Sequence, residues 1–495
     1  AKNLRSDLFH RIQTYSFENI DKFSSSSLVT RMTTDVTNVQ MAFMMLIRIA
    51  IRSPLLLIFS TVMAFVMGGK LAFVFVVVIP ILAFGLLAIG KKAMPAFRSV
   101  FKKYDRLNES IEENVRGMRV VKGFSREEYE KQKFNTAADN IRKDFTKAEC
   151  IVALNTPLMN LCMYINMVVV LLVGSKLAII SGGSALDVGQ ISGMLTYGMQ
   201  ILMSLMMLSM IYVMDTMSAE SAKRICEVLE EEPSLKEPDH PVMEVKDGSI
   251  EFKNVNFKYS ARAKKYALSS IDLSIRSGMT VGIIGGTGSS KSSLVQLIPR
   301  LYDVTEGAVL VGGVDVRDYD IPTLRSAVAM VLQKNVLFSG TIRDNLRWGN
   351  ETATDEEIME ACRLSQADEF IQTFPDKYDT YIEQGGSNVS GGQKQRLCIA
   401  RALLKKPKIL ILDDSTSAVD TKTDALIRAG FKNYIPDTTK IIIAQRIASV
   451  EDADLIIVMD NGSISAAGTH EDLLQSSDIY REVYEQQTKG GNENE

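Results

Sequence analysis

Four long stretches of the chain carry apolar residues without a single Asp, Glu, Lys or Arg: residues 53–69, 71–90, 151–175 and 188–214. A helix rises about 1.5 Å per residue, so about 20 apolar residues cross the hydrocarbon layer of a membrane. The last three stretches reach that length. The first reaches it by borrowing from residues 41–51, and Arg48 and Arg52 can then snorkel or face an interior. The pattern predicts four membrane spans rather than four buried helices of a large soluble protein.

The loops between these stretches indicate the orientation of the spans. Residues 91–147 carry fifteen Lys or Arg, the turn at 68–70 carries one, and residues 177–187 carry none. Because positively charged loops stay on the cytoplasmic side, the basic loop is expected in the cytoplasm. Two mixed-charge helical arms, over 98–116 and 126–147, then extend the spans beyond the membrane. Four spans also return the chain to the side on which it began.

A different pattern begins after the last span. Residues 226–247 form an acidic, proline-bearing linker, and an α/β domain follows over 248–488, with a flexible tail at 489–495; the membrane domain takes 1–225. Alternation over 249–259 predicts a strand, and 292–302 an amphipathic helix. Thr354 and Glu357 form a capping box, and Asp460-Asn461-Gly462 is a hairpin turn. Further short apolar strands, typical of a mostly parallel sheet, are predicted at 280–284, 328–332, 409–412, 441–444 and 455–459.

Composition supports this division and excludes several functions. The mean hydropathy of +0.05 is an average of one apolar half and one ordinary half. The chain has 23% charged residues and 12 prolines, which excludes a disordered chain, and its net charge of −3 gives no reason to expect a nucleic-acid partner. Five scattered cysteines fit a reducing cytoplasmic face, and three histidines make imidazole-based metal chemistry improbable.

The predicted strand at 280–284 runs into a glycine-rich turn and then a helix, which is the setting of a phosphate-binding P-loop. Such a loop needs glycines so that backbone N–H groups can surround phosphates, a lysine for the β and γ oxygens, and a hydroxyl for Mg²⁺. Ser290 stands where the motif has its last glycine, so the strict pattern fails by one residue. The loop consists of Gly285, Gly286, Thr287, Gly288, Ser289, Ser290, Lys291 and Ser292.

Two further segments complete a nucleotide site. The strand that ends near residue 412 is followed by Asp413 and Asp414, and a carboxylate at a strand end beside a P-loop is the usual Mg²⁺ partner. A second set of small residues precedes the basic helix at 394–404 and makes another anion site: Ser390, Gly391, Gly392 and Gln393. Two phosphate sites in one domain make sense if the second serves the nucleotide of another copy.

With this ordered motif set, the chain resembles an ABC transporter subunit of the bacterial multidrug-exporter type over essentially its whole length. The resemblance implies an α-helical transmembrane domain and an α/β P-loop nucleotide-binding domain with a helical subdomain. It also implies ATP and Mg²⁺ as cofactors, a head-to-tail dimer with a second half-transporter, and residence in the cytoplasmic (inner) membrane. The expected function is ATP-driven export of small hydrophobic or amphipathic molecules across that lipid bilayer.

The same resemblance assigns roles by position. Tyr259 is similar to the aromatic residue that stacks on adenine, and Gln333 to the Q-loop glutamine between Mg²⁺ and the membrane domain. Residues 285–293, including Ser293, resemble the Walker A loop, and residues 389–393 the signature, with Val389 in place of the usual leucine. Asp413 resembles the Walker B aspartate, and Ser417, Ala418, Val419 and Asp420 resemble the D-loop. The implied Mg²⁺ ligands are Ser292, Gln333 and Asp413.

Two catalytic positions depart from the family pattern. Asp414 stands where the family has its catalytic glutamate, and Gln445 where it has its switch histidine. The aspartate carboxylate stops about 1.5 Å short, and glutamine cannot carry imidazolium charge. Together the departures indicate the degenerate-site subunit of a heterodimer, whose own signature completes the partner's site. Alternatives are a slow homodimer, an engineered trap, or a lipid or peptide flippase; the spans argue against a soluble DNA-repair or translation ATPase.

Other features follow from the resemblance or remain open. Family half-exporters have six spans, so two helices are expected to precede this sequence. Coupling helices are expected near 17–23 and 121–129, one of which docks on the partner. Phe17, Phe23 and Phe124 are the candidate anchors, with an ordinary core role as the alternative for each. The last span is rich in methionine, which suits either a pocket for varied apolar ligands or a lipid and packing surface: Met194, Met199, Met203, Met206, Met207, Met210, Met214 and Met217.

Overall fold

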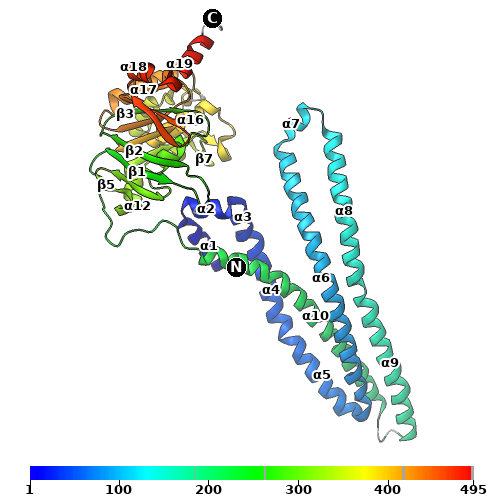
Figure 1. Cartoon of the computed structure of the whole chain (residues 1–495). Helices are drawn as coiled ribbons and strands as arrows, with labels where there is room; N and C mark the ends of the chain where they lie inside the picture. The colour runs from blue at the N-terminus through cyan, green and yellow to red at the C-terminus, as the bar shows by residue number, and fades with distance from the viewer. Residues whose placement is uncertain (183, 185, 261–262, 415–418, 492–495) are drawn as a thin grey trace. The chain divides into compact units, whose positions relative to one another are not determined.

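The computed structural model describes residues 1–182, 184, 186–260, 263–414 and 419–491. It divides into two compact units. Figure 1 shows the whole chain, coloured by residue number from blue at the N-terminus to red at the C-terminus. The first unit comprises Ala1–Gln13 and Ser25–Glu231, and the second comprises Thr14–Ser24 and Glu232–Glu495. A short N-terminal segment therefore packs with the C-terminal unit rather than with its sequence neighbours.

The first unit is entirely helical in its described part. Three continuous helical stretches are long and apolar enough to cross a membrane: 25–97, 127–180 and 188–211. The first of them contains two predicted spans, which the tight turn η3 joins. The four predicted stretches thus lie in α5, α6, α9 and α10. The elements of this unit are α1 (Lys2–Gln13), α3 (Ser25–Thr30), η1 (Arg31–Asp35), α4 (Val36–Met45), η2 (Leu46–Ala50), α5 (Arg52–Gly68), η3 (Gly69–Ala72), α6 (Phe73–Arg116), α7 (Met118–Gly123), α8 (Glu127–Ala153), α9 (Asn155–Ile180) and α10 (Val188–Glu230).

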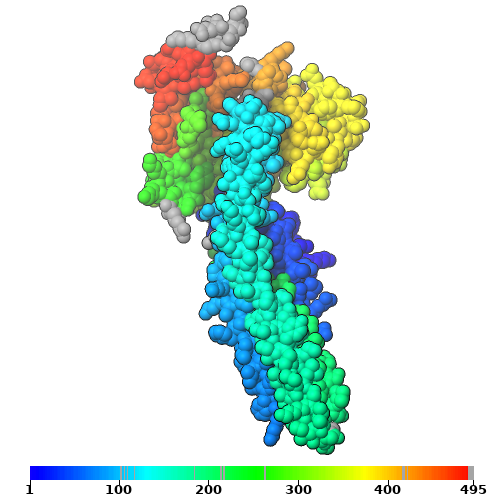
Figure 2. All heavy atoms as spheres, turned by 90° about the vertical axis from the view of Figure 1, so that its right-hand side faces the viewer, coloured from blue at the N-terminus to red at the C-terminus, as the bar shows by residue number. Residues whose placement is uncertain are grey.

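The long arms predicted from the basic loop are continuous with the spans. α6 runs for 44 residues and α8 for 27, with α7 between them. The two long helices lie side by side in Figure 1, and Phe97 and Phe145 meet edge to face with ring centroids 6.0 Å apart. In the space-filling view their cyan side chains form one continuous column (Figure 2). The arms therefore behave as a two-helix hairpin that carries α7 at its tip.

Small residues allow the apolar helices to approach closely. A Cβ at Gly198 of α10 would lie 2.4 Å from the Asn166 side-chain amide and 2.9 Å from the Phe75 ring, so only glycine fits there. Helices in a membrane associate through such close packing, because lipid is as apolar as a leucine side chain. Large side chains such as Phe84 and Ile179 are exposed on the outer faces, as expected of helices that contact lipid.

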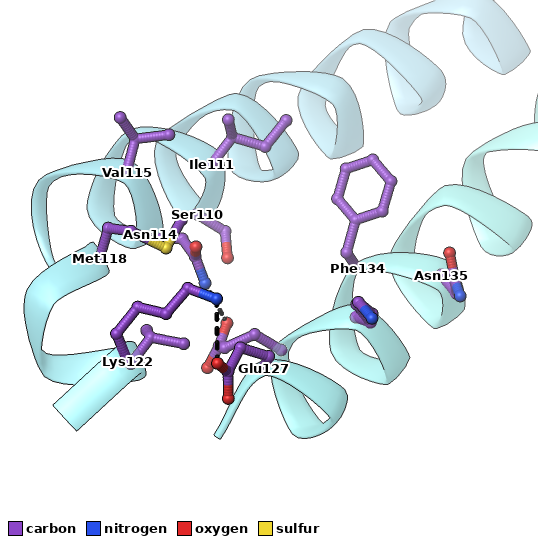
Figure 3. Close-up of a pocket in the computed structure, with 12 residues that line it drawn as sticks. Ser110, Ile111, Asn114, Val115, Met118, Lys122, Glu127, Phe134 and Asn135 are labelled. Atoms are coloured by element: carbon purple, nitrogen blue, oxygen red, sulfur yellow. Dashed lines mark hydrogen bonds and ion pairs between the residues drawn. The ribbon is translucent and has the colours of Figure 1, made fainter. Parts of the chain in front are cut away.

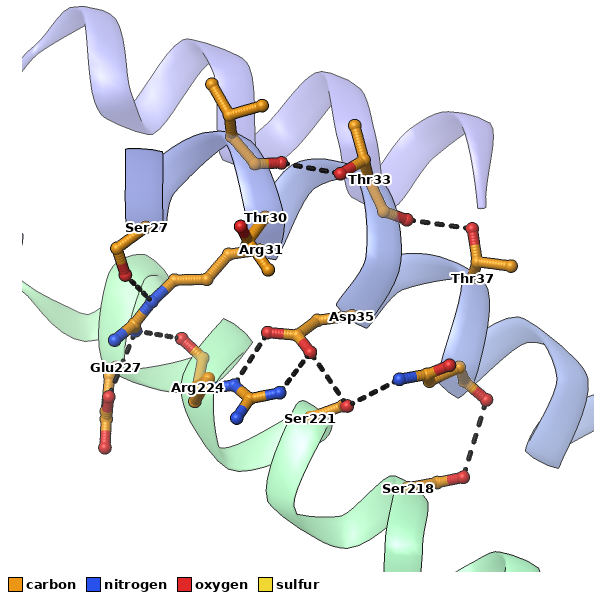
Figure 4. A network of polar contacts seen from close by, with 12 residues as sticks. Ser27, Thr30, Arg31, Thr33, Asp35, Thr37, Ser218, Ser221, Arg224 and Glu227 are labelled. Atoms are coloured by element: carbon orange, nitrogen blue, oxygen red, sulfur yellow. Dashed lines mark hydrogen bonds and ion pairs between the residues drawn. The ribbon is translucent and has the colours of Figure 1, made fainter. Parts of the chain in front are cut away.

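A buried ion pair joins η1 to the C-terminal part of α10 (Figure 4). Asp35 is fully buried, and its Oδ2 accepts a hydrogen bond from Nε of Arg224 at 2.8 Å, while Nη2 of the same arginine contacts Oδ1. The hydroxyl of Ser221 also donates to Oδ1, at 2.9 Å, and accepts from the Asn38 amide at 3.1 Å. The carboxylate is thus satisfied on both oxygens, which a buried charge requires.

The second unit contains two main sheets. The six-stranded sheet has the order β12-β11-β3-β10-β9-β6, with five neighbouring parallel strands and β12 antiparallel at one edge. The four-stranded sheet, β2-β1-β4-β5, is antiparallel, and β7 pairs with β8. The strands are β1 (Ile250–Phe257), β2 (Leu268–Ile275), β3 (Thr280–Gly285), β4 (Glu306–Val311), β5 (Val314–Asp315), β6 (Val328–Val331), β7 (Gly340–Thr341), β8 (Tyr381–Ile382), β9 (Ile409–Asp413), β10 (Thr439–Ile443), β11 (Leu455–Asp460) and β12 (Ser463–Gly468).

Two hydrophobic cores cover the faces of the six-stranded sheet. One core fills the space between the two sheets, and the other packs helices such as α14 and α16 on the opposite face. Alternate residues of β9 and β10 enter the two cores, so every residue of both strands is buried. The helices are α2 (Phe17–Phe23), α11 (Lys291–Gln296), α12 (Ile321–Ala327), α13 (Ile342–Arg347), α14 (Asp355–Leu364), α15 (Asp368–Ile371), α16 (Gly391–Leu403), α17 (Thr421–Tyr434), α18 (His470–Ser476) and α19 (Asp478–Gly491).

The local predictions hold with one correction. The apolar strands lie where the pattern placed them, the Thr354 capping box forms, and Asn461 and Gly462 take the positive φ angles of a hairpin turn. The helix predicted over 292–302 is wrong in length, because α11 ends at Gln296. Pro299 disfavours helix at the residue before it, and Arg300 adopts a left-handed conformation with φ 49°.

The ion pair of Figure 4 predicts an unequal response to losing either partner. Arg224→Ala leaves a fully buried carboxylate without its cation, which should lower the free energy of unfolding by about 3–5 kcal/mol. Asp35→Asn leaves an arginine whose side chain is 41% exposed and can be hydrated, so the cost should be about 1–2 kcal/mol. Thermal unfolding of the detergent-solubilised chain measures both. Equal losses would show that burial of the carboxylate does not control this contact.

Candidate functional site

The glycine-rich turn joins β3 to α11 and has the backbone shape that its sequence predicts. A Cβ at Gly285 would lie 2.2 Å from the carbonyl oxygen of Met459 on the neighbouring strand β11, so the position admits only glycine. Gly288 has φ 84°, in the region that favours glycine. The turn therefore closes over the carboxyl end of β3 and leads directly into the first turn of a helix.

Ser290 adopts a conformation in which glycine is preferred. It caps α11 with φ 69° and ψ 25°, which is left-handed, and its side chain makes no capping hydrogen bond. The sequence departure at this position is thus accommodated by a strained serine. A left-handed conformation costs a residue other than glycine about 1–2 kcal/mol. Replacement by glycine would recover only part of this energy, because glycine has more conformational freedom in the unfolded chain.

Lys291 is held by the loop itself. Its Nζ donates to the carbonyl oxygens of Gly285 and Gly286 at 2.8 and 2.9 Å, and to Oγ of Ser289 at 3.3 Å. Burial lowers the pKa of Lys291, and the nearby carboxylates of Asp413 and Asp414 oppose that shift. The loop carbonyls thus hold the cation at the place where the motif needs one for phosphate oxygens.

Asp413, at the end of β9, faces the same loop. Ser292 donates from Oγ to its Oδ1 at 3.1 Å. Burial raises the pKa of Asp413, the Ser292 hydrogen bond lowers it, Asp414 raises it and Lys291 lowers it. A hydroxyl and a carboxylate oxygen this close are ligands of the hard type that Mg²⁺ prefers, so these residues fit the ion that the sequence implies.

Asp414 is buried and joins three segments of the site. It has φ 49°, and its backbone N–H donates to the carbonyl of Ile443 at 3.0 Å. Its Oδ2 accepts hydrogen bonds from Nε2 of Gln333 at 3.3 Å and from Nε2 of Gln445 at 2.7 Å. The two glutamines follow β6 and β10, the strands on either side of β9. The two predicted departures and the predicted Q-loop residue therefore meet at one carboxylate.

An aromatic cluster borders the helix after the glycine-rich turn. The Tyr259 hydroxyl lies 2.7 Å from Oγ of Ser293 and donates to Oε1 of Gln296 at 3.3 Å. Its ring meets the Tyr302 ring edge to face, with centroids 5.1 Å apart. Burial is the main cause that raises the pKa of Tyr259. Tyr259 thus lies beside the helix that follows the loop, and it packs on an aromatic neighbour that sequence reasoning did not single out.

Tyr302 connects this cluster to α2. Its hydroxyl donates to Oδ2 of Asp21 at 2.8 Å, and its ring lies 6.1 Å from that of Phe17. Burial, and then the hydrogen bond to Asp21, raise the pKa of Tyr302. Two further contacts fix α2 in this unit, since Asn19 donates to the Glu232 carbonyl at 3.0 Å and accepts from the Ser234 backbone N–H at 3.0 Å. The predicted anchor Phe17 packs near Tyr302, whereas Phe23 stacks on Tyr15 within the same N-terminal segment.

The signature segment forms a separate helix start. Ser390 caps α16 and exchanges hydrogen bonds with Gln393, whose side chain accepts from the Ser390 N–H at 2.9 Å. Gly391 and Gly392 form the first turn of that helix. Among the described residues, no hydrogen bond joins this segment to the glycine-rich turn. Asp420 caps α17, and Ser417 and Ala418 of the predicted D-loop lie outside the described residues.

One contact at the site has no sequence signal. Gln487 of α19 donates from Nε2 to the carbonyl of Gln445 at 2.8 Å and accepts from the backbone N–H of Ile447 at 2.9 Å. A glutamine in a polar C-terminal helix looks like any solvated residue, so its proximity to residue 445 appears only in the fold. Tyr302 is also unmarked, because an aromatic after an amphipathic helix most often belongs to the core.

The strain at Ser290 predicts that Ser290→Gly stabilises the chain. The net gain should be about 0.5–1 kcal/mol, which corresponds to a rise of about 1–3 °C in the thermal unfolding midpoint. Ser289→Gly is the matched control, because Ser289 is not left-handed and loses its contact with Lys291. The control should lower the midpoint. A fall with Ser290→Gly would show that the serine is not strained.

Comparisons with known proteins agree with this geometry. The family described as the ABC transporter transmembrane region matches residues 1–205, and the family described as ABC transporter matches residues 268–417. The ABC transporter ATP-binding protein YfiB of Bacillus subtilis is 38% identical over 483 residues, which is 98% of this chain and 83% of that relative. Rv1273c of Mycobacterium tuberculosis, an ABC transporter ATP-binding protein, is 38% identical over 487 residues, covering 97% and 83%.

A solved structure shares the whole fold. A bacterial Atm1-family ABC exporter with ATP bound superposes with a TM-score of 0.86 at 25% identity, over 98% of this chain and 85% of that one. The apolar helices, the parallel sheet with its glycine-rich turn, and the extent of these matches lead to one conclusion. The chain belongs to the ABC transporter family and joins a transmembrane domain to a cytoplasmic ATP-binding domain in one polypeptide, which is the architecture of a half-transporter.

Proposed function

We propose that the chain is one half of a heterodimeric ABC exporter whose own ATP site hydrolyses slowly or not at all. The observation that carries this proposal is the pair of amide donors on Asp414, from Gln333 and Gln445. Two donors fill the two lone pairs of Oδ2, so this oxygen has no site left to accept a proton from the attacking water. The aspartate is also about 1.5 Å shorter in reach than glutamate, and neither glutamine can take up a proton at neutral pH.

The proposed ATP site uses the residues of the glycine-rich turn. Backbone N–H groups at the start of α11 and the Lys291 cation would bind the phosphates, and Tyr259 would stack on adenine. Ser292, Asp413 and Gln333 would hold Mg²⁺, which neutralises phosphate charge when bound. The signature residues Ser390, Gly391, Gly392 and Gln393, with Asp420, would complete the partner's site, where a consensus glutamate and histidine carry out hydrolysis.

The transport cycle follows from differential binding. ATP must bind the closed pair of nucleotide domains more tightly than the open pair, and that difference drives the helices from inward-facing to outward-facing. Residues 1–225 would form the membrane domain, 226–247 the linker, 248–488 the nucleotide-binding domain and 489–495 the tail. Hydrolysis at the partner's site would return the pair to its open state.

The packing of α2 in the ATP-binding unit suggests which coupling helix serves the partner. α2 contacts its own chain's unit through Asp21 and Tyr302, so we assign α7 to the partner. α7 lies beside a groove of about 590 Å³ between α6 and α8, lined by apolar side chains such as Ile111 and Phe134 (Figure 3). The predicted anchor Phe124 is 76% exposed, which suits a docking surface.

The methionine-rich face of α10 supports a small hydrophobic or amphipathic substrate. Met194 is buried against Gly68. Several others are exposed, and exposed methionines can repack around ligands of different shape: Met199, Met203, Met206, Met207 and Met210. The side chain of Met217 lies outside the described part. The same surface would also suit lipid, so a lipid substrate is an outcome that transport assays separate.

Restoring the two family residues should raise hydrolysis at this chain's own site. Asp414→Glu with Gln445→His places a longer carboxylate and a protonatable ring at the site, and a positioned general base contributes about 10²–10⁴-fold. We expect at least about a tenfold rise in vanadate-sensitive ATPase activity of the purified chain in vesicles. Each single substitution should give less, because the two groups act as a unit.

Wild-type chain purified alone provides the decisive control. Full substrate-stimulated ATPase activity without any second chain would contradict the proposal and favour the homodimer. Low activity that co-expression of a partner restores would support it. Transport of fluorescent drugs, lipids and peptides by the reconstituted pair then identifies the substrate class.

The contact between α2 and the aromatic cluster predicts a coupling defect. Tyr302→Phe removes the hydroxyl that donates to Asp21 and keeps the ring that packs on Tyr259. ATP affinity should therefore stay within about twofold, while substrate stimulation of ATPase activity falls about threefold to tenfold, the effect of one net hydrogen bond. Tyr266→Phe is the matched control, because Tyr266 also donates to a carboxylate, that of Glu306. Loss of ATP affinity with full stimulation would contradict this role.

A further inference from the structure

The C-terminal helix α19 is firmly attached to the ATP-binding unit. Tyr480 is fully buried, and its hydroxyl lies 2.8 Å from Nδ1 of His470. The Tyr484 ring lies 5.3 Å from the same histidine ring, and Val483 packs on the helical core. These anchors fix the position of the helix, so a residue farther along the same face can hold a neighbouring segment in place.

Gln487 lies seven residues after Tyr480, which is about two helical turns and therefore on the same face. One side-chain amide makes two hydrogen bonds to the backbone on either side of Arg446. Nε2 donates to the carbonyl of Gln445 at 2.8 Å, and Oε1 accepts from the N–H of Ile447 at 2.9 Å. The amide thus uses both its donor and its acceptor on one short segment.

That segment connects α19 to the candidate site. The side chain of Ile447 is buried in the core beside the sheet, whereas the side chain of Gln445 reaches Asp414 with an Nε2 to Oδ2 distance of 2.7 Å. Ile447 fixes one end of the segment by packing, which sets position but not the orientation of the peptide planes. Two directional hydrogen bonds from Gln487 set that orientation, and with it the direction of the Gln445 side chain.

We propose that Gln487 is a positioning residue that holds residues 445–447, the switch segment, so that Gln445 stays at Asp414 and at the γ-phosphate of bound ATP. This inference rests on the proposed role of Gln445. The assignment makes the C-terminal helix part of the nucleotide site, although none of its residues belongs to a motif of the domain. Because the γ-phosphate distinguishes ATP from ADP, loss of this support affects the binding of ATP and not of ADP.

The test uses Gln487→Leu, which removes both hydrogen bonds at similar size, and Gln487→Glu, which keeps an acceptor for Ile447 and loses the donor to Gln445. Gln486→Leu is the matched control, because the Gln486 amide bonds to Glu482 on its own helix. The full chain is co-expressed with its partner in membranes. Photolabelling with azido-ATP, competed by ATP or ADP, reads this chain separately on a gel, whichever chain hydrolyses.

For Gln487→Leu we expect ATP competition to weaken about threefold to tenfold, the equilibrium effect of one net hydrogen bond, with ADP competition unchanged. Amide hydrogen exchange should quicken in the peptide that contains residues 445–449 and stay constant in the peptide that contains Lys291. Gln487→Glu should lie between wild type and Gln487→Leu. Gln486→Leu should match wild type in every measurement.

Three outcomes would overturn the proposal. Unchanged exchange at 445–449 would show that Gln487 does not hold the segment. Faster exchange with equal effects on ATP and ADP would show a structural contact without a role toward the γ-phosphate. A parallel loss of thermal stability and of both nucleotides would show that Gln487 only maintains the fold. The Asp414→Glu and Gln445→His variants test the degenerate site separately, so failure of either inference is recognised on its own.

Discussion

The carboxylate of Asp414 is the group on which the geometry of the ATP site depends. It follows strand β9, and it accepts hydrogen bonds from glutamines that follow β6 and β10, the strands on either side. A buried anion must be satisfied, because an unpaired one would be strongly penalised. The requirement to satisfy this single charge therefore orders two loops at once, and both loops take their position from a side chain that is one carbon shorter than the family's glutamate.

Elements that depend on local pattern could be predicted from the sequence. Runs of apolar residues predicted helices that now lie in α5, α6, α9 and α10, within three stretches apolar enough to cross a membrane, and short apolar runs located the parallel strands, because both signals lie within one segment. The antiparallel strands β2 and β4 were not identified, and α11 proved shorter than its amphipathic pattern. Strand pairing and the helix end at Pro299 depend on neighbours that the pattern does not contain.

Contacts between distant segments were beyond sequence reasoning for a physical reason. Asp35 pairs with Arg224, and Asp21 with Tyr302, across long separations in the chain. Taken alone, each of these residues would be interpreted as a solvated charge or as an aromatic residue of the core. Only the fold brings these partners together, and it buries Asp35 completely, which makes a partner for that carboxylate necessary. The motif residues could be singled out because their spacing is local, whereas Gln487 and Tyr302, which contact Gln445 and Tyr259, carry no local signal.

Two sets of contacts leave the nucleotide site in different directions, and their chemistry differs. From the P-loop helix, the Ser293 hydroxyl leads through Tyr259 and Tyr302 to Asp21 of α2, and this route is built from aromatic rings that pack and hydroxyl groups that orient them. From Asp414, the route runs through Gln445 to Gln487 and consists of amides only. Packed aromatic rings resist compression, so the first route suits transmission of a displacement to α2, the proposed coupling helix. Hydrogen bonds of amides are directional, so the second suits a segment that must keep the orientation of its peptide planes, as we propose for residues 445–447.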